Sequence, residues 1–253
     1  MDAVELLGQR SVGNMCRLAK ILEKAGLPFA VISVSAFMLH GIDLGRTTRD
    51  LDLAVAIEGG LDAIRTVLAS AGLTSTSIEH HFRMPDGSEI DVLAIDPART
   101  PAHEIQLADG DRIQAVGLPD AVRRSVEMAF DACRVSVAPV CLLIAIKLHA
   151  AISDDRPHDV GDACMALQTY ESGGGRRFDV NYERFAELTF ETAGAFLAGQ
   201  DTAELVADDT KAYVLEAIQI LLHAPQQTNR YVDGEARSAL LHAYQRGVNT
   251  GSA

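Results

Sequence analysis

Residues 50–56 read DLDLAVA, in which two aspartates alternate with leucines ahead of an unbroken apolar stretch. Alternation with a period of two is typical of a β-strand with one polar side. Strands disfavour aspartate, so its use at both Asp50 and Asp52 indicates a functional role. Side chains two positions apart on a strand project to the same side, with α-carbons about 7 Å apart. Their carboxylates can therefore converge on one hard cation, and magnesium suits this geometry.

A third aspartate, Asp91, has similarly apolar neighbours. Residues 75–84 and 88–96 flank a Pro-Asp-Gly turn, and we expect them to form the two arms of a hairpin, with Asp91 in the second arm. Carboxylates that cluster without a cation repel one another, so such a cluster is not expected to exist for stability alone. The three aspartates therefore predict a metal-binding cradle on adjacent strands.

The sequence around these aspartates predicts a mixed sheet flanked by helices. Further strands are predicted at residues 28–33 and near 112–116 and 134–137. Helices are predicted at residues 3–24, 35–41 and 60–72, and then, in an almost purely helical second part, at 139–153, 158–169, 181–198, 203–223 and 235–247. We therefore expect an α+β fold, with an α/β domain at residues 1–137 and a helical domain at residues 138–253.

Composition excludes several classes of protein. The 253 residues carry 22 basic and 35 acidic side chains, a net charge of −13 with neutral histidines, which argues against a sequence-blind nucleic-acid coat. The longest apolar run, residues 140–146, is far shorter than the ~20 residues of a membrane span, and the first residues do not resemble a signal peptide. We therefore expect a cytoplasmic protein that does not bind membranes.

Four scattered cysteines lack the spacing of a zinc or redox site, and we expect buried thiols.

Several common catalytic motifs are missing from the sequence. It contains no Gly-Lys-Ser/Thr of a P-loop, no GxSxG, no HExxH and no CxxC. The triple glycine at 173–175 leads to Arg176 and is interpreted as a linker. His80 and His81 are consecutive in a predicted strand, so their side chains point to opposite faces and cannot readily share a metal ion. The aspartates remain the strongest functional signal.

The order of the motifs resembles the polymerase-beta-like nucleotidyltransferase fold, especially its AbiEii-like branch of bacterial toxin nucleotidyltransferases. The resemblance covers residues 25–165. It is carried by Ser33-Val34-Ser35-Ala36, His40-Gly41, Arg46-x-Thr48-x-Asp50-x-Asp52 and Asp91, and in the helical part by Lys147, Arg156, His158-Asp159 and Asp162.

The resemblance implies metal-dependent transfer of a nucleoside monophosphate from an NTP to an acceptor, with pyrophosphate as the leaving group. It implies that Asp50, Asp52 and Asp91 are catalytic and bind Mg²⁺ or Mn²⁺. It also implies nucleotide-binding roles for a second set of residues: Ser33, Ser35, Arg46, Lys147, Arg156, Asp159 and Asp162.

The sequence departs from the family pattern at two places. Such enzymes usually end the first strand with Gly-Gly or Gly-Ser, whose backbone amides approach the triphosphate, whereas this chain has Ser33 and Val34. The Cβ atoms hinder that approach, although the Ser33 or Ser35 hydroxyl can donate a hydrogen bond instead. The second departure is His158, which replaces a lysine and lowers the positive charge when the imidazole is neutral.

Three functions are compatible with these residues. The leading hypothesis is transfer to a macromolecule, a tRNA or a protein side chain, by the toxin of a toxin–antitoxin or phage-defence pair, with a cognate antitoxin as partner; the resemblance alone supplies this context. The second hypothesis is a small-molecule acceptor of the aminoglycoside type, which the net negative charge favours. The third is a non-catalytic module that binds nucleotides or a partner, which the replaced glycines favour.

Overall fold

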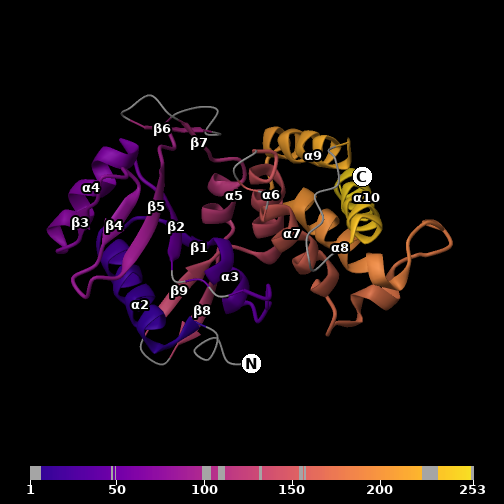
Figure 1. The fold of residues 1–253 in the computed structure, drawn as a ribbon, viewed down its shortest axis with the longest axis horizontal. Helices are drawn as coiled ribbons and strands as arrows, with labels where there is room; N and C mark the ends of the chain where they lie inside the picture. Colours follow the sequence, from indigo (N-terminus) through magenta and orange to yellow (C-terminus); the bar gives the residue numbers. More distant parts are fainter. Residues whose placement is uncertain are drawn as a thin grey trace. The chain divides into compact units, whose positions relative to one another are not determined.

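The computed structural model describes residues 7–46, 48, 50–98, 104–107, 112–130, 133–153, 156, 158–223 and 233–251. The chain divides into two compact units, Met1–Pro139 and Val140–Ala253 (Figure 1). The first unit contains a mixed β-sheet with helices, and the second is helical. The predicted α+β fold class is thus confirmed.

The N-terminal unit is built on a seven-stranded sheet with the strand order β3-β4-β5-β2-β1-β9-β8. Its strands are β1 (Phe29–Ile32), β2 (Leu51–Ala56), β3 (Thr74–Ser75), β4 (His81–Arg83), β5 (Glu89–Ile95), β8 (Val126–Phe130) and β9 (Cys133–Val137). The β2–β5 and β1–β9 pairs are parallel, and the others are antiparallel. A separate antiparallel pair consists of β6 (Glu104–Gln106) and β7 (Arg112–Gln114). The hairpin predicted around the Pro-Asp-Gly turn is confirmed by the antiparallel pairing of β4 with β5.

Among the residues of this unit that the structure describes, helices α2 (Gln9–Lys24), α3 (Ser33–Leu39), α4 (Gly60–Ser70) and α5 (Leu118–Arg123) accompany the sheet. Helix α2 is amphipathic, and its buried stripe of Met15, Leu18 and Leu22 follows the spacing of one helix face. It packs against β9 (Figure 1). The apolar stripe thereby fixes α2 on one face of the sheet.

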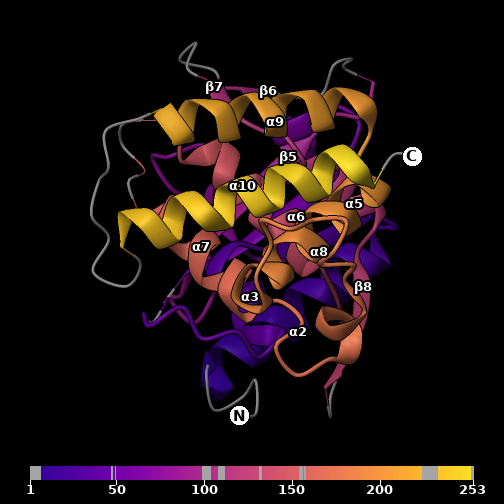
Figure 2. The ribbon, with the colours of Figure 1, turned by 90° about the vertical axis from the view of Figure 1, so that its right-hand side faces the viewer.

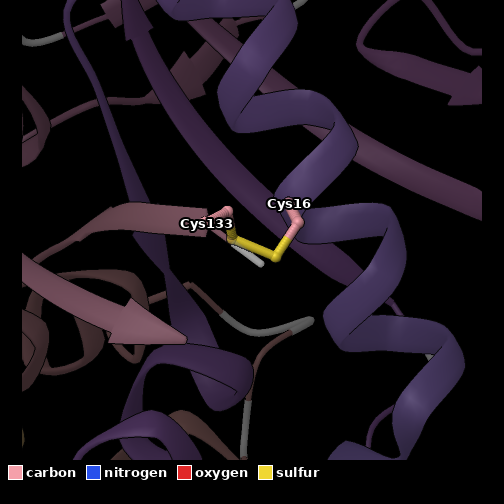
Figure 3. The surroundings of a disulfide bond; sticks show 2 residues. All are labelled: Cys16 and Cys133. Atoms are coloured by element: carbon pink, nitrogen blue, oxygen red, sulfur yellow. A yellow bond between two sulfur atoms is a disulfide. The ribbon is translucent and has the colours of Figure 1, made fainter. Parts of the chain in front are cut away.

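A disulfide strengthens this packing. Cys16 of α2 is bonded to Cys133 at the start of β9, with the two α-carbons 5.6 Å apart (Figure 3). The prediction of buried thiols is therefore wrong for this pair and correct for Cys141 and Cys164, which are free and buried. This disulfide could not be predicted from the sequence, because the two cysteines are 117 residues apart and only the packing of α2 on the sheet brings their sulfur atoms together.

We expect iodoacetamide to distinguish these two classes of cysteine. Burial raises the pKa of the Cys141 and Cys164 thiols to about 12, and alkylation requires an accessible thiolate. Mass spectrometry at pH 8 should find no label on the native protein, labels on Cys141 and Cys164 after denaturation, and labels on all four cysteines after reduction. Labelling of Cys16 in denatured, unreduced protein would contradict the disulfide.

The C-terminal unit contains helices α6 (Val140–Ala150), α7 (Asp159–Thr169), α8 (Phe190–Leu205), α9 (Asp208–His223) and α10 (Gly234–Thr250), and the 3₁₀-helix η1 (Gly175–Asp179). Helix α10 runs alongside α8 (Figure 2). At their contact, a side chain on Gly199 would overlap the backbone of Tyr244, and one on Gly247 would overlap the backbone of Phe196. Small residues thus permit the close approach of the two helices.

Two predicted helices of this unit begin at the wrong residue. The helix predicted at 203–223 begins at Asp208, because α8 continues to Leu205. The helix predicted at 181–198 begins at Phe190 as α8, and residues 182–187 before it form turns. Thr189 and Thr192 form a reciprocal capping box that fixes the start of α8.

Within the described ranges, no helix is both long and apolar enough to cross a membrane.

Candidate active site

The predicted site residues of the N-terminal unit gather at one edge of the sheet. Strand β1 runs antiparallel to β2, so the end of β1 lies beside the start of β2, with Ile32 opposite Asp52. Strand β5 runs parallel to β2, so it begins at the same edge. The end of β1 and the starts of β2 and β5 therefore bring Ser33, Asp52 and Asp91 to one edge.

Asp52 and Asp91 are direct neighbours across the β2–β5 pair. They are register partners in a parallel ladder, so their side chains share one face of the sheet on strands about 4.8 Å apart. Both are half-buried. Two carboxylates held side by side by backbone hydrogen bonding form a site that attracts a hard cation, because the charge of a cation offsets their mutual repulsion.

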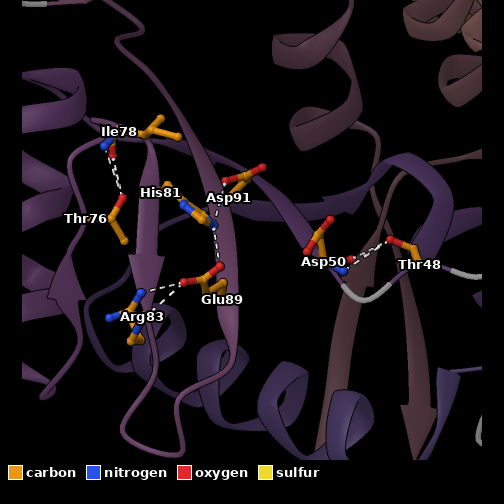
Figure 4. Close-up of polar contacts among 8 residues, drawn as sticks. All are labelled: Thr48, Asp50, Thr76, Ile78, His81, Arg83, Glu89 and Asp91. Atoms are coloured by element: carbon orange, nitrogen blue, oxygen red, sulfur yellow. Dashed lines mark hydrogen bonds and ion pairs between the residues drawn. The ribbon is translucent and has the colours of Figure 1, made fainter.

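Asp50 is placed differently from the other two aspartates. It precedes β2, is exposed, and exchanges hydrogen bonds with Thr48: its backbone amide donates to Thr48 Oγ1, and this hydroxyl donates to the Asp50 carbonyl, both at 3.2 Å (Figure 4). In the described ranges, no three histidine, cysteine, aspartate or glutamate side chains are grouped so that they could hold a metal ion. The structure thus sets Asp52 and Asp91 side by side, with Asp50 two residues before Asp52 along the chain.

A histidine that the sequence analysis discounted faces this pair. His81 of β4 lies opposite Asp91, with Nε2 3.8 Å from Asp91 Oδ1 and 3.6 Å from Glu89 Oε2 (Figure 4). Arg83 donates to Glu89 Oε1 at 2.7 Å, and this hydrogen bond lowers the pKa of Glu89. Asp91 therefore belongs to a polar row that continues through His81 and Glu89 to Arg83. The register across the Pro-Asp-Gly turn was the signal that could have revealed it.

Ser33 has an unusual backbone conformation at the junction of β1 and α3. Its φ of 63° lies in the left-handed region, which glycine adopts without steric cost and other residues avoid. Two residues on, Ser35 is buried and donates from Oγ to the Ile32 carbonyl at 3.1 Å. The backbone at Ser33 thus has a conformation that glycine adopts readily, although the residue is serine.

Replacing Ser33 with glycine should stabilise the protein. The strain energy that glycine relieves at this left-handed position is larger than the free-energy cost of the extra conformational entropy that glycine gives the unfolded chain. We therefore expect Ser33→Gly to raise the free energy of unfolding by about 1 kcal/mol. Urea denaturation measures the change. Ser35→Gly is the matched control and should lower stability by about 1 kcal/mol or more, because position 35 is helical and loses a hydrogen bond. A loss of stability in both variants would refute this account of Ser33.

A pocket of about 430 Å³ opens beside Asp50. It is lined by Leu7, Arg10, Ser11, Asn14, Met15, Ser35, Thr48, Asp50, Leu51, Gly87, Ser88, Glu89 and Ile90. Of the predicted residues, Asp50 and Ser35 are part of this lining, whereas Asp52 and Asp91 are not. Leu51 points into the pocket, and since neighbours on a strand alternate, Asp52 projects to the opposite face. Asp50, which immediately precedes β2, is therefore the predicted carboxylate that lines the pocket.

The remaining predicted residue of this unit, Arg46, is exposed in the loop before β2. Its neighbours in that loop, Thr47 and Arg49, lie outside the described residues. The positive side chain of Arg46 is thus placed in the loop that leads to Asp50.

The predicted residues of the C-terminal unit form a separate buried cluster. Lys147 of α6 lies between two carboxylates at the start of α7, with Nζ 2.5 Å from Asp159 Oδ1 and 3.1 Å from Asp162 Oδ2. All three are less than 10% exposed. Arg156 approaches Asp159 at 3.8 Å from the exposed side, and His158 is exposed at the N-cap of α7. The spacing of three residues puts both carboxylates on one helix face, where they hold the lysine.

Comparison with known sequences decides the family. The sequence profile of the family described as the nucleotidyl transferase AbiEii toxin of type IV toxin–antitoxin systems matches residues 36–231, which is well over half of the chain. The chain belongs to the AbiEii family. It is therefore a nucleotidyl transferase, as the order of its motifs predicted. No curated protein matches the chain.

The solved structures that the chain resembles have low sequence identity and TM-scores below 0.5. An antigenic nucleotidyltransferase-like protein from Paracoccidioides brasiliensis is 16% identical, with a TM-score of 0.42 over 61% of this chain and 74% of that one. ANT(2″)-Ia in complex with adenylyl-2″-tobramycin is 14% identical, with a TM-score of 0.45 over 70% and 98% of the two chains. The CD-NTase CdnG of Bradyrhizobium diazoefficiens in complex with GTP is 13% identical, with a TM-score of 0.30 over 100% and 88%. The assignment to AbiEii rests on the sequence profile.

Proposed function

We propose that this AbiEii chain transfers a nucleoside monophosphate from an NTP to a macromolecular acceptor, a tRNA or a protein side chain, as the toxin of a type IV toxin–antitoxin pair. The observation that carries the proposal is the register of β2 and β5, which sets Asp52 beside Asp91 at the sheet edge where Ser33 adopts a glycine-like conformation. A carboxylate pair at this sheet edge suits binding of a cation together with the phosphates it neutralises.

The carboxylates fit magnesium or manganese. Both are hard cations that prefer oxygen ligands, and magnesium is usually bound through one or two protein carboxylates together with substrate phosphates. The lack of a three-carboxylate group among the described residues is compatible with that mode of binding. We assign Asp52 and Asp91 as the main ligands and Asp50 as an additional one. The cation would neutralise phosphate charge during transfer.

The cluster in the C-terminal unit suits contact with phosphate. Lys147 is held by two carboxylates, so we propose that Asp159 and Asp162 orient its ammonium group toward a phosphate oxygen of the nucleotide. Arg156 is 58% exposed and offers a planar set of donors for the same purpose. We further assign Ser33, Ser35 and Arg46 to the triphosphate, with the Ser33 hydroxyl donating in place of the approach that glycine would permit.

Radiolabelled nucleotides test the proposal. The wild-type protein is incubated separately with each of the four α-labelled NTPs, magnesium and total tRNA, and also with a cell extract as a source of protein acceptors. We expect label to enter RNA or protein with one preferred NTP. A folded protein that transfers no label from any NTP, with magnesium or manganese, would contradict the proposal.

A further inference from the structure

His81 lies in a row of polar side chains that crosses three neighbouring strands. It is the register partner of Asp91 in the antiparallel β4–β5 pair, and Asp91 is the register partner of Asp52 in the parallel β2–β5 pair. Register partners on neighbouring strands project to the same face of a sheet, so the histidine and the two aspartates share one face. The proposed function gives a role to both aspartates and none to the histidine.

The imidazole of His81 faces two carboxylates of β5. Its Nε2 lies 3.8 Å from Asp91 Oδ1 and 3.6 Å from Glu89 Oε2 (Figure 4). Both distances are within ion-pair range, and both are longer than the roughly 3 Å of a good hydrogen bond. Because Nε2 carries at most one proton, a small movement of the ring decides which of the two carboxylates accepts it.

Arg83 favours donation to Asp91. Its guanidinium donates twice to Glu89 Oε1, from a terminal nitrogen at 2.7 Å and from Nε at 3.3 Å. Glu89 therefore already has a positively charged partner, which weakens its attraction for the proton on Nε2. The side chain of His81 is only 20% exposed, so the surrounding side chains limit how far the ring can move away from Asp91.

The contact with His81 engages one oxygen of Asp91 and leaves the other for a cation. The contact is made to Oδ1, and the second carboxylate oxygen points away from the ring (Figure 4). A carboxylate that accepts a hydrogen bond at one oxygen keeps a fixed orientation and can bind a metal ion through the other. Such a fixed oxygen suits magnesium, which demands nearly ideal octahedral geometry.

Direct coordination by His81 is the less favourable arrangement. Magnesium and manganese prefer carboxylate, carbonyl and water oxygens, whereas imidazole suits zinc, copper and similar metals. Among the residues that the structure describes, no group of three histidine, cysteine, aspartate or glutamate side chains could hold a metal ion. The histidine is therefore better placed to act on Asp91 than on the cation itself.

We propose that His81 is a positioning residue of the transfer reaction, which donates from Nε2 to Asp91 Oδ1 and thereby orients this carboxylate toward the divalent cation. Glu89, itself held by Arg83, keeps the imidazole in place from the other side. The inference rests on the proposed function, because that function requires Asp91 to bind the cation.

Two substitutions of His81 separate the proton donor from the bulk of the ring. His81→Leu fills much of the same space and removes the donor. His81→Gln keeps a donor, because the glutamine amide nitrogen reaches about as far from the backbone as Nε2 does. His242→Leu is the control for the loss of a histidine, since His242 is exposed on α10 of the C-terminal unit.

Manganese binding measured without turnover tests the role of the donor. The electron paramagnetic resonance signal of free Mn²⁺ gives the Kd in the presence of a non-hydrolysable NTP analogue, and circular dichroism verifies that each variant is folded. We expect His81→Leu to raise this Kd at least ~10-fold, and His81→Gln and His242→Leu to leave it within about threefold. A purely structural role would lower the denaturation midpoint of His81→Leu and leave its Kd unchanged. That result, or a Kd in His81→Gln as high as in His81→Leu, would overturn the inference.

Spectroscopy of the wild-type protein tests the same point without a variant that has to fold. Pulsed electron paramagnetic resonance of bound Mn²⁺, compared between unlabelled protein and protein containing ¹⁵N-histidine, detects a directly bound histidine nitrogen. We expect no such nitrogen, and we expect Mn²⁺ to broaden the nuclear magnetic resonance signals of the His81 ring, because the ring lies beside a ligand. A bound histidine nitrogen would make His81 a ligand, and unbroadened signals would place the cation elsewhere; either result would overturn the inference.

These measurements keep the inference separate from the proposed function, because none of them requires transfer. A wild-type protein that binds Mn²⁺ with the expected dependence on His81 but transfers no label would contradict the proposed function alone. A protein that transfers label while its Kd for Mn²⁺ is the same in the wild type and in His81→Leu would contradict the inference alone. A folded wild-type protein that binds no Mn²⁺, even with the analogue present, would overturn the inference together with the assignment of the carboxylates to a cation.

Discussion

Asp52→Asn should reduce nucleotide transfer at least ~10³-fold, which corresponds to about 4 kcal/mol of transition-state stabilisation. The amide removes one of two adjacent negative charges at the sheet edge, so the remaining carboxylate attracts a divalent cation much less strongly. Removing a charge next to Asp91 also relieves repulsion, so the free energy of unfolding should stay equal or rise. Initial rates with labelled NTP and urea denaturation measure the two effects.

The control for this variant is an exposed aspartate of the same unit. Asp62 lies on α4 with its side chain 92% exposed and pairs only at the surface with Arg65. Asp62→Asn should change the rate less than about twofold, because surface ion pairs contribute little. If Asp52→Asn retained most of the activity of Asp62→Asn, the catalytic assignment would fail. If a toxic effect survived Asp50→Asn with Asp52→Asn, the hypothesis of a non-catalytic binding module would replace it.

Lys147→Met should lower the free energy of unfolding by about 3–5 kcal/mol. The substitution leaves Asp159 and Asp162 buried without the ammonium group that lies between them, and an uncompensated buried charge is costly. Thermal and urea denaturation measure the loss. Arg156→Met removes the exposed partner of Asp159 and should cost less than about 1 kcal/mol.

A combined variant isolates the electrostatic cause. Lys147→Met with Asp159→Asn and Asp162→Asn removes the lysine and both charges together, so we expect it to recover at least half of the stability lost in Lys147→Met. Stability of the combined variant equal to or below that of Lys147→Met would show that packing of the lysine stem, rather than the ion pair, accounts for the loss.

The sequence predicted those parts of the site that follow from periodicity. Alternation at 50–56 placed Asp50 and Asp52 at the start of a strand, and the Pro-Asp-Gly turn placed Asp91 on the next arm. The parallel β2–β5 register then brings Asp52 and Asp91 together. The order of motifs, including Lys147 and Asp159, was sufficient to recognise the AbiEii family.

Other features depend on tertiary packing that no local pattern encodes. Cys16 meets Cys133 only because α2 lies against β9. The contact of His81 with Asp91 depends on the register of the hairpin, and the pocket beside Asp50 depends on the placement of α2. Strand β8 was missed although Val126, Met128 and Phe130 alternate along one face, and none of its five residues is buried in the structure. The capping box that starts α8 uses Thr192 instead of the glutamate or glutamine of the usual sequence signature.

A crystal structure of the full chain with a non-hydrolysable NTP analogue and manganese tests the central claim most directly. Anomalous scattering locates the manganese ion without reference to the protein. The account predicts an anomalous peak about 2.2 Å from carboxylate oxygens of both Asp52 and Asp91, with phosphate oxygens of the analogue completing the coordination. An ordered analogue whose manganese contacts neither carboxylate would contradict it.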